Sequence, residues 1–286
     1  MDIVFAGLGS MGSGMARSLL RAGHRVHGID PNADAARAFA AAGGAEALSE
    51  CDAVVSCVLN AAQTEAALFG ADGLAARLRP GGLIVSCATV APSDARRFAA
   101  MAEGLLYLDA PISGGAAKAA EGALSVMASG APEAFAAATP ILDACAETVF
   151  PLGNAPGAGS AMKAVNQLLA GVHIAAMAEA MTFGISQGVD PDTFMKVIPR
   201  CAGTSWMLEN RGPHVARGDY RPRSAVDIWP KDLGIVLDAA RVAGFAAPLA
   251  ATAMQRFVAA SGSGLGREDD AAVAKVYARD AGLDLP

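Results

Sequence analysis

The sequence predicts an α/β domain built on a doubly wound parallel sheet, followed by an all-helical domain, with one long helix joining the two. In the first half, short apolar runs of strand type alternate with Ala-rich runs of helix type, as a helix-covered parallel sheet requires. From residue 157 to 188 good helix formers continue without a proline, and only helical segments follow. The chain of 286 residues is also long for one domain. We therefore expect a first domain over residues 1–155 and a second over 156–286.

The composition narrows the classes of partner. A formal net charge of −6 and a pI near 5.2 provide no long-range attraction for nucleic acid or an anionic membrane. Residues 1–6 read as a strand and not as a signal segment, so we expect a soluble, cytoplasmic protein. The five cysteines form no C-x-x-C pair and the four histidines show no ligand spacing, so we expect no metal site. Small molecules or other proteins remain as partners.

The first strand, expected over residues 2–6, runs directly into a glycine-rich turn. That turn reads Gly7-Leu8-Gly9-Ser10-Met11-Gly12, and a helical pattern follows it. In a G-x-G-x-x-G motif the first glycine permits a tight turn, the second lets the backbone approach a pyrophosphate, and the third lets helix pack on strand. The pyrophosphate then lies at a helix N-terminus. The alternative is an ordinary tight turn, but the strand, the helix and the acidic residue described next favour a dinucleotide site.

A second strand is expected over residues 25–29, and it ends in Asp30, 18 residues beyond Gly12. This separation is close to the roughly 20 residues expected for the acid that binds the cofactor ribose. A carboxylate at that position accepts hydrogen bonds from ribose hydroxyls and repels a 2′-phosphate. Because no arginine follows closely, the sequence predicts NAD as cofactor, with NADP as the less favoured alternative.

Three apolar runs are predicted to complete the parallel sheet, and two later ones to extend it. The runs are 53–59, 83–87 and 106–110, then 125–128 and 148–151. Ligands of open α/β sheets bind at the carboxyl ends of the strands. Asn60 and Thr89 lie there and are candidate cofactor contacts, although both residue types also serve as N-caps of the following helix.

The segment Ser113-Gly114-Gly115 follows the run 106–110 and is poor in side chains. It presents one hydroxyl and several backbone N–H groups at close quarters, which suits a carboxylate ligand. The alternative is a plain strand-to-helix turn, which requires the glycines but has no need of the serine.

The expected long helix, 157–188, carries Lys163, Asn166 and Gln167 at the i, i+3 and i+4 positions of one face. Oxidation of an alcohol by a nicotinamide cofactor needs a group that takes the hydroxyl proton, and Lys163 is the candidate for this acid/base role. The alternative is a surface lysine whose stem lies along the helix. The helix is also apolar enough to suggest a membrane span, but the polar residues along it would be costly in lipid, so we expect no membrane insertion.

Four motifs, in order and spacing, resemble the signatures of the β-hydroxyacid dehydrogenase family, which includes 3-hydroxyisobutyrate dehydrogenases and tartronate semialdehyde reductases. The motifs are the glycine turn 7–12, the segment 109–115, the pattern Gly157-x-Gly159-x-x-x-Lys163-x-x-Asn166 and Lys231-Asp232-Leu233. The resemblance covers the whole chain. It implies a Rossmann N-terminal domain, a helical C-terminal domain that also mediates assembly into a homodimer or homotetramer, and an active site between them.

The resemblance also assigns roles to individual residues. It implies that Lys163 is the acid/base and that Ser113, Gly114 and Gly115 hold the carboxylate of a small hydroxy acid. Asn166, with Gln167 beside it, would hold a substrate oxygen. Asn60, Thr89 and Lys231 match cofactor contacts of the family.

Within the family, the residues around Lys163, 205–214 and 224–237 look most like the L-threonate dehydrogenase branch, which oxidises a four-carbon sugar acid at its 2-hydroxyl. Gln167 replaces the second Asn of the common K-x-x-N-N pattern, and Pro230 precedes Lys231 where an apolar residue is usual. Tartronate semialdehyde reductase and 3-hydroxyisobutyrate dehydrogenase remain alternatives. A catalytically silent NAD-binding regulator is the alternative outside the enzymes.

Overall fold

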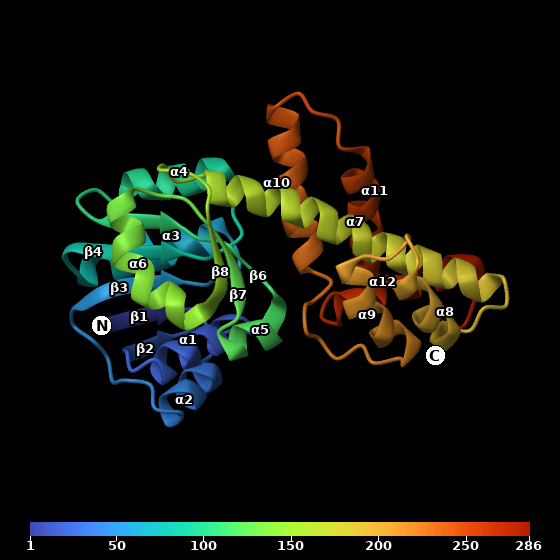
Figure 1. Cartoon of the computed structure of the whole chain (residues 1–286), viewed down its shortest axis with the longest axis horizontal. Helices are drawn as coiled ribbons and strands as arrows, with labels where there is room; N and C mark the ends of the chain where they lie inside the picture. The colour runs from blue at the N-terminus through green and yellow to red at the C-terminus, as the bar shows by residue number, and fades with distance from the viewer. The chain divides into compact units, whose positions relative to one another are not determined.

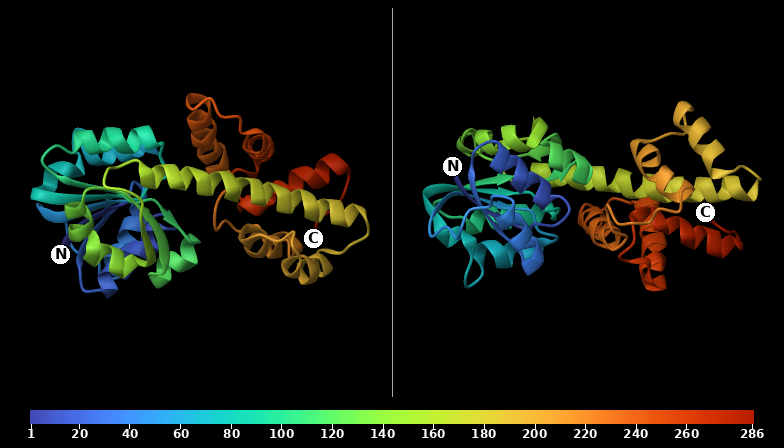
Figure 2. Two further views of the ribbon diagram at one scale, coloured as in Figure 1. Left: turned by 45° about the horizontal axis from the view of Figure 1, so that its top comes forward. Right: turned by 90° about the horizontal axis from the view of Figure 1, so that it is seen from below.

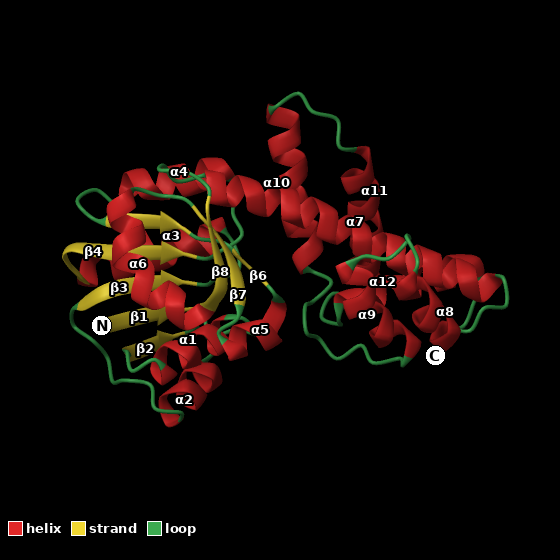
Figure 3. Cartoon of the chain, in the orientation of Figure 1, coloured by secondary structure: helices red, strands yellow, loops and turns green.

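The computed structural model describes all residues, 1–286, and their contacts divide the chain into two compact units, 1–163 and 164–286. Each unit is described by itself. Figure 1 labels the helices and strands, and Figure 3 shows that every strand belongs to the first part of the chain. The expected α/β fold followed by helices is confirmed.

The first unit contains a five-stranded parallel sheet with the strand order β2-β1-β3-β4-β5. Its strands are β1 (Asp2–Ala6), β2 (Arg25–Ile29), β3 (Cys51–Ser56), β4 (Leu78–Ser86) and β5 (Leu106–Asp109). The chain passes outward from β1 to β2 and then returns to place β3 on the other side of β1. The carboxyl ends of β1 and β3 therefore form the switch point at which such sheets bind ligands.

Helices cover both faces of this sheet, as the views in Figure 2 show. They are α1 (Gly12–Arg21), α2 (Ala33–Ala41), α3 (Ala61–Phe69), α4 (Pro92–Met101) and α6 (Pro132–Cys145), whereas α5 (Gly115–Glu121) packs on α1 and β7. Side chains alternate along each strand, so Phe5 belongs to a core with Leu19 of α1, whereas Val4 belongs to a second core with Phe98 of α4. The strands are apolar on both faces for this reason, and the doubly wound sheet is confirmed.

The late strands form a separate three-stranded sheet and do not extend the parallel one. They are β6 (Ile112–Ser113), β7 (Leu124–Ala128) and β8 (Ala146–Pro151), in the order β6-β7-β8. The expectation of a single sheet was wrong because the chain continues from β5 through Pro111 into β6, which pairs antiparallel with β7. A bridge between Asp109 and Ser129 links the two sheets.

The second unit is all-helical, as expected. Its helices are the greater part of α7 (Ala158–Ser186), then α8 (Pro191–Val197), α9 (Trp206–Ala216), α10 (Ile228–Val242), α11 (Pro248–Ala260) and α12 (Val273–Ala281). Trp229 of α10 stacks on Phe257 of α11 with 5.5 Å between ring centroids. A Cβ atom on Gly171 of α7 would lie 2.9 Å from Leu233 of α10, so glycine permits the close approach of these helices.

The 29-residue helix α7 is long and apolar enough to cross a membrane by length and composition. A helix in the core of a globular protein can meet the same criteria of length and composition. Ile174, Met177 and Met181 of α7 are almost fully buried against other helices of the second unit. We therefore interpret α7 as a core helix whose apolar character serves packing.

Candidate functional site

The glycine turn after β1 has the geometry of a nucleotide-binding loop. Gly7 has a φ of +94°, and a Cβ atom there would lie 2.5 Å from the carbonyl oxygen of Cys57 after β3. A Cβ on Gly12 would lie 1.8 Å from the carbonyl oxygen of Gly7, whereas one on Gly9 would meet nothing within 4 Å. The first and third glycines are thus required by the fold. The second glycine faces open space, where a ligand can approach the backbone.

Asp30 lies at the end of β2 and is tied to the glycine turn. Its Oδ2 accepts a hydrogen bond from the Leu8 N–H at 2.7 Å, and its Oδ1 accepts one from the Asn32 N–H at 2.8 Å. A carboxylate has about four lone-pair sites, so both oxygens can still accept from a ribose hydroxyl. The carboxylate is held in place beside the loop before any ligand arrives.

The N-terminus of α1 is suited to an anion. No side chain caps this ten-residue helix, and its first turn contains no acidic residue. Free N–H groups and the helix dipole both favour a phosphate there. Together with the open space at Gly9 and the fixed Asp30 carboxylate, the residues present fit a nicotinamide dinucleotide.

Asn60 and Thr89 differ in their position relative to the helices that follow them. Asn60 is the N-cap of α3, because its Oδ1 accepts from the Gln63 N–H at 2.8 Å. The N-cap of α4 is Ala91, so Thr89 is not the N-cap residue of the helix that follows it. The capping bond of Asn60 uses its oxygen and leaves its amide N–H groups as donors. A cofactor contact stays a prediction for both residues.

The Ser113-Gly114-Gly115 segment connects β6 to α5. Gly114 and Gly115 have φ values of +135° and +79°, a region in which any other residue would be strained. A Cβ on Gly115 would meet nothing within 4 Å, so the backbone at this point borders open space. Ser113 itself is half-buried at the end of β6. The segment therefore combines a backbone turn that requires glycine with backbone that a ligand can approach.

Lys163 is buried, with 7% of its surface exposed, and this excludes the interpretation as a solvated surface lysine. Its Nζ donates a hydrogen bond to the carbonyl oxygen of Ile112 at 2.8 Å. Ile112 immediately precedes Ser113 in β6. The structure thus brings together the lysine and the Ser-Gly-Gly segment, which are about 50 residues apart in the chain.

Asp109, which the sequence analysis did not single out, anchors the start of α7. The carboxylate is 1% exposed; its Oδ2 accepts from the N–H groups of Gly157 and Ser160, both at 2.9 Å. Its Oδ1 accepts from the Ser160 hydroxyl at 2.7 Å. Ser129 Oγ donates to Asp109 at 3.1 Å and accepts from the Gly159 N–H at 2.9 Å. A negative charge at a helix N-terminus is stabilising, and it fixes the turn that precedes Lys163.

In the second unit, Asn166 and Gln167 join Lys231 and Asp232 in one polar network. Asn166 Nδ2 donates to Gln167 Oε1 at 2.9 Å, and Gln167 Nε2 donates to Asp232 Oδ2 at 2.5 Å. Lys231 Nζ lies 2.6 Å from Asp232 Oδ1. Asp232 is 2% exposed and was seen in the sequence only as part of a motif. Its partner Gln167 is 65 positions away, and no local pattern signals such a contact.

Pro230 does not disturb the helix that carries Lys231. Helix α10 begins at Ile228, so the proline is its third residue. In the first turn of a helix the backbone N–H groups have no intrahelical partner, and a proline loses no hydrogen bond there. The unusual residue before Lys231 is therefore compatible with a regular helix.

The five cysteines are free thiols, and four of them are buried or half-buried. Burial raises the pKa of Cys57 to about 12 and that of Cys145 also to about 12. Only the thiolate is a nucleophile or a strong metal ligand. The described residues also contain no group of three or more His, Cys, Asp or Glu side chains placed to hold a metal ion.

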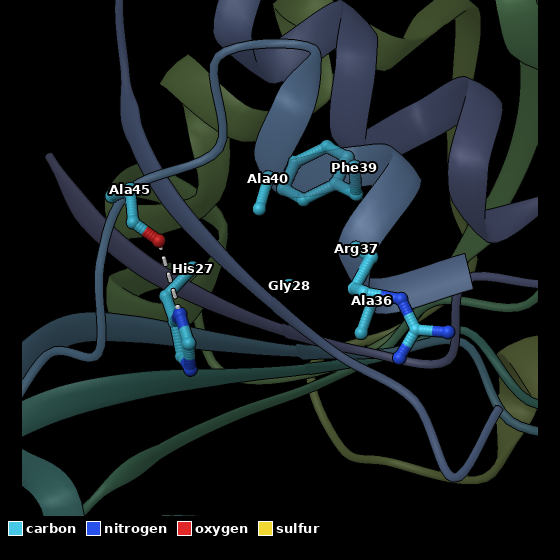
Figure 4. Close-up of a pocket in the computed structure, with 7 residues that line it drawn as sticks. All are labelled: His27, Gly28, Ala36, Arg37, Phe39, Ala40 and Ala45. Atoms are coloured by element: carbon cyan, nitrogen blue, oxygen red, sulfur yellow. Dashed lines mark hydrogen bonds between the residues drawn. The ribbon is translucent and has the colours of Figure 1, made fainter. Parts of the chain in front are cut away.

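A separate pocket of about 240 Å³ lies between β2 and α2 (Figure 4). His27 Nδ1 lies 3.2 Å from the Ala45 carbonyl oxygen at one side of it, and Arg37 lies at the other. Its lining contains none of the residues that the sequence singled out. The candidate residues lie elsewhere, with Asp30 bonded to the glycine turn and Lys163 bonded to Ile112.

Comparison with known proteins agrees with this geometry. Residues 2–153 match the family described as the NAD-binding domain of 6-phosphogluconate dehydrogenase. Residues 157–277 match the family described as NAD-binding of NADP-dependent 3-hydroxyisobutyrate dehydrogenase. The two matches divide the chain near the start of α7.

Whole-chain relatives show the same similarity. An L-threonate dehydrogenase of Cupriavidus necator is 54% identical over 100% of this chain and 98% of its own length. A 3-hydroxyisobutyrate dehydrogenase of Pseudomonas aeruginosa is 37% identical over 90% of this chain and 91% of its own length. A crystal structure of a 3-hydroxyisobutyrate dehydrogenase from Salmonella typhimurium has a TM-score of 0.91 at 47% identity, covering 96% of this chain and 99% of its own. The chain therefore belongs to the β-hydroxyacid dehydrogenase family and is an NAD(P)-dependent hydroxyacid dehydrogenase.

Proposed function

We propose that this protein oxidises a four-carbon sugar acid, L-threonate in the first instance, with NAD as cofactor and Lys163 as the acid/base. The observation that carries the proposal is the position of Lys163, whose Nζ lies 2.8 Å from the Ile112 carbonyl beside the Ser-Gly-Gly segment. A proton carrier next to a segment that can bind a carboxylate is what oxidation of a hydroxy acid requires. The name of the relative at 54% identity supports threonate as the substrate.

The cofactor site is proposed at the glycine turn 7–12, with Asp30 binding the ribose hydroxyls. The nicotinamide ring supplies the hydride acceptor when it is bound. Asn60, Thr89 and Lys231 are proposed as further contacts. The carboxylate of Asp30 is held within the first unit by two backbone N–H groups, so it cannot easily turn away from a 2′-phosphate. This supports NAD over NADP.

The substrate carboxylate is proposed to bind at Ser113, Gly114 and Gly115. The Ser113 hydroxyl and the backbone N–H groups of the two glycines are donors, and a carboxylate accepts from several donors at once. Asn166 is proposed to hold a further substrate oxygen.

Lys163 is proposed to take the proton of the hydroxyl group that is oxidised. One N–H of Nζ is directed to the Ile112 carbonyl, which fixes the orientation of the amine and of its lone pair when it is neutral. In the reverse direction the ammonium returns the proton to the oxygen. The carbonyl of Ile112 thus serves to orient the group that carries the proton.

The test is the formation of NADH by the purified protein, followed by its absorbance. Threonate, erythronate, glycerate, 3-hydroxyisobutyrate and tartronate are each offered with NAD and with NADP. We expect the highest kcat/KM for L-threonate with NAD. Absence of turnover with every hydroxy acid would contradict the proposal as a whole.

Two alternatives give different results in this screen. A 3-hydroxyisobutyrate dehydrogenase or a tartronate semialdehyde reductase would prefer its own substrate over threonate, and relatives of the former kind support this candidate. A catalytically silent regulator would bind NAD and produce no NADH. The burial of Lys163 beside the Ser-Gly-Gly segment argues against the silent protein, because an unused lysine has no reason to be buried there.

The domain limits and the assembly are also proposed. We assign the cofactor domain to residues 1–155 and the substrate and assembly domain to 156–286, with 157–188 as the connecting helix. Val165, Leu169 and Phe183 form an apolar stripe on α7 and are 56%, 49% and 65% exposed. Such a stripe supports a homodimer or homotetramer in which a second copy covers it. Light scattering on the wild type and on Leu169→Glu tests this, and a monomeric wild type would contradict it.

The cytoplasm is the proposed location. All five thiols are free, which suits a reducing compartment, and the substrate and cofactor are small water-soluble molecules. Neither a nucleic acid nor a membrane is proposed as a partner, because the net charge of −6 attracts neither.

A further inference from the structure

The polar network of the second unit determines which atom of Asn166 remains for the substrate. Asp232 is buried and paired with Lys231, whose Nζ lies 2.6 Å from Asp232 Oδ1. A carboxylate paired with a lysine can only accept hydrogen bonds. The atom that Gln167 directs to Asp232 Oδ2, 2.5 Å away, must therefore be its Nε2 and not its Oε1.

The orientation of the Gln167 amide in turn determines the orientation of the Asn166 amide. Once Nε2 of Gln167 faces Asp232, its Oε1 faces Asn166 and can only accept. Asn166 must then donate through Nδ2, as the structure shows at 2.9 Å. The carbonyl oxygen of Asn166 is left without a bond in the network, on a residue that is only half-buried.

From this sequence of hydrogen bonds we propose that Gln167 is a positioning residue that makes Asn166 Oδ1 an acceptor for a substrate hydroxyl. This inference rests on the proposed function and narrows its substrate class. An acceptor repels a carboxylate and selects a hydroxyl donor, so the site favours hydroxy acids that carry a further hydroxyl beyond the one oxidised. It disfavours simple aliphatic hydroxy acids, in which Asn166 Oδ1 would stay unpaired on binding.

The side chain of Gln167 must be long enough to bond both Asp232 and Asn166. An Asn at this position is one methylene shorter, which removes more than 1 Å of reach along the side chain. At the present backbone positions it cannot bridge Asp232 and Asn166 at hydrogen-bond distances. The orientation of the Asn166 amide would then no longer be determined by Asp232.

The experiment compares two substrates that share a carboxylate and a 2-hydroxyl. L-Threonate carries further hydroxyls, and 2-hydroxybutyrate has none. We expect Gln167→Met, which has similar length but no polar groups, to lower kcat/KM for L-threonate by about 10- to 100-fold, the effect of one hydrogen bond to a hydroxyl. For 2-hydroxybutyrate the change should stay within about threefold. Asp232→Asn, which lets the Gln167 amide turn either way, should act in the same direction.

Controls separate this effect from loss of structure. Gln187→Met changes an exposed glutamine near the end of α7 and should leave both substrates unaffected. NADH affinity and the melting temperature of each variant report on folding. Equal losses for the two substrates in a folded Gln167→Met protein would overturn the inference, because they would mean that Asn166 binds a group common to both. If the wild type oxidises neither substrate nor any other hydroxy acid, the proposed function itself has failed.

Discussion

Single residues in this protein are held by backbone groups that come from distant parts of the chain. Asp30 takes its position from the Leu8 N–H, Lys163 from the Ile112 carbonyl, and Asp109 from the first turn of α7. Each contact fixes a charged group before any ligand binds. Preorganisation of this kind lowers the cost of ordering a site when substrate and cofactor arrive.

At Asp30 the proposed cofactor site predicts selectivity between NAD and NADP. Asp30→Ala removes the carboxylate that repels a 2′-phosphate, so the ratio of kcat/KM with NAD to that with NADP should fall by about tenfold or more. Steady-state kinetics with both cofactors measure this ratio. Asp34→Ala, at an exposed carboxylate four residues along, is the matched control. An unchanged ratio in Asp30→Ala would show that another group selects the cofactor.

Among the secondary-structure elements, two carboxylate clusters tie strands and helices together. One is the anchoring of α7 by Asp109. The other lies at the opposite end of the strands, where Arg79 of β4 pairs with Asp2 of β1 and with Asp52 of β3. Both clusters join elements that are far apart in the chain.

Replacing Asp109 should affect catalysis through α7. Asp109→Asn introduces an amide among four donor groups, so the first turn of α7 loses its charged acceptor, at a cost of about 1.5–3 kcal/mol in the free energy of unfolding. Because that turn precedes Lys163, kcat should fall while NAD affinity is retained. Urea unfolding measures the free energy of unfolding, steady-state kinetics measure kcat, and titration with NAD measures the affinity for the cofactor. Asp190→Asn, at the exposed N-cap of α8, is the control, and a wild-type kcat in Asp109→Asn would contradict the positioning role.

The cluster at Arg79 predicts a dependence of stability on pH. The N–H of Asp2, which donates to Asp52 at 2.8 Å, and the Arg79 guanidinium lower the pKa of the Asp52 carboxyl below 3.8. A lowered pKa in the folded state adds stability above the unfolded value, and this stability is lost as pH falls through the folded value. Asp52→Asn should thus be less stable than wild type at pH 7, and the difference should shrink below about pH 4. Unfolding at several pH values tests this, with exposed Asp72→Asn as control; a constant difference would contradict it.

For the molecule as a whole, local sequence patterns predicted most helices and strands, and they predicted an α/β domain followed by a helical one. The helix 157–188 and the glycine turn were recognisable because periodicity and glycine spacing are properties of neighbouring residues. The antiparallel pairing of β6 with β7 was not recognisable, because it depends on how the chain turns at Pro111. Lys163 could be singled out as a candidate because its polar neighbours lie one turn away. Asp109 and Asp232 could not, because the contacts of Asp109 with Ser160 and of Asp232 with Gln167 join residues 51 and 65 positions apart.

The central claim is that Lys163 carries the proton in oxidation of a hydroxy acid. The measurement that tests it most directly is NADH formation from L-threonate by Lys163→Ala and by the wild type, with NAD affinity determined for both. We expect kcat of the variant to fall by about 10²–10⁴, the usual loss when a general acid/base is removed, while NAD binds as before. Turnover near that of the wild type in Lys163→Ala would contradict the mechanism.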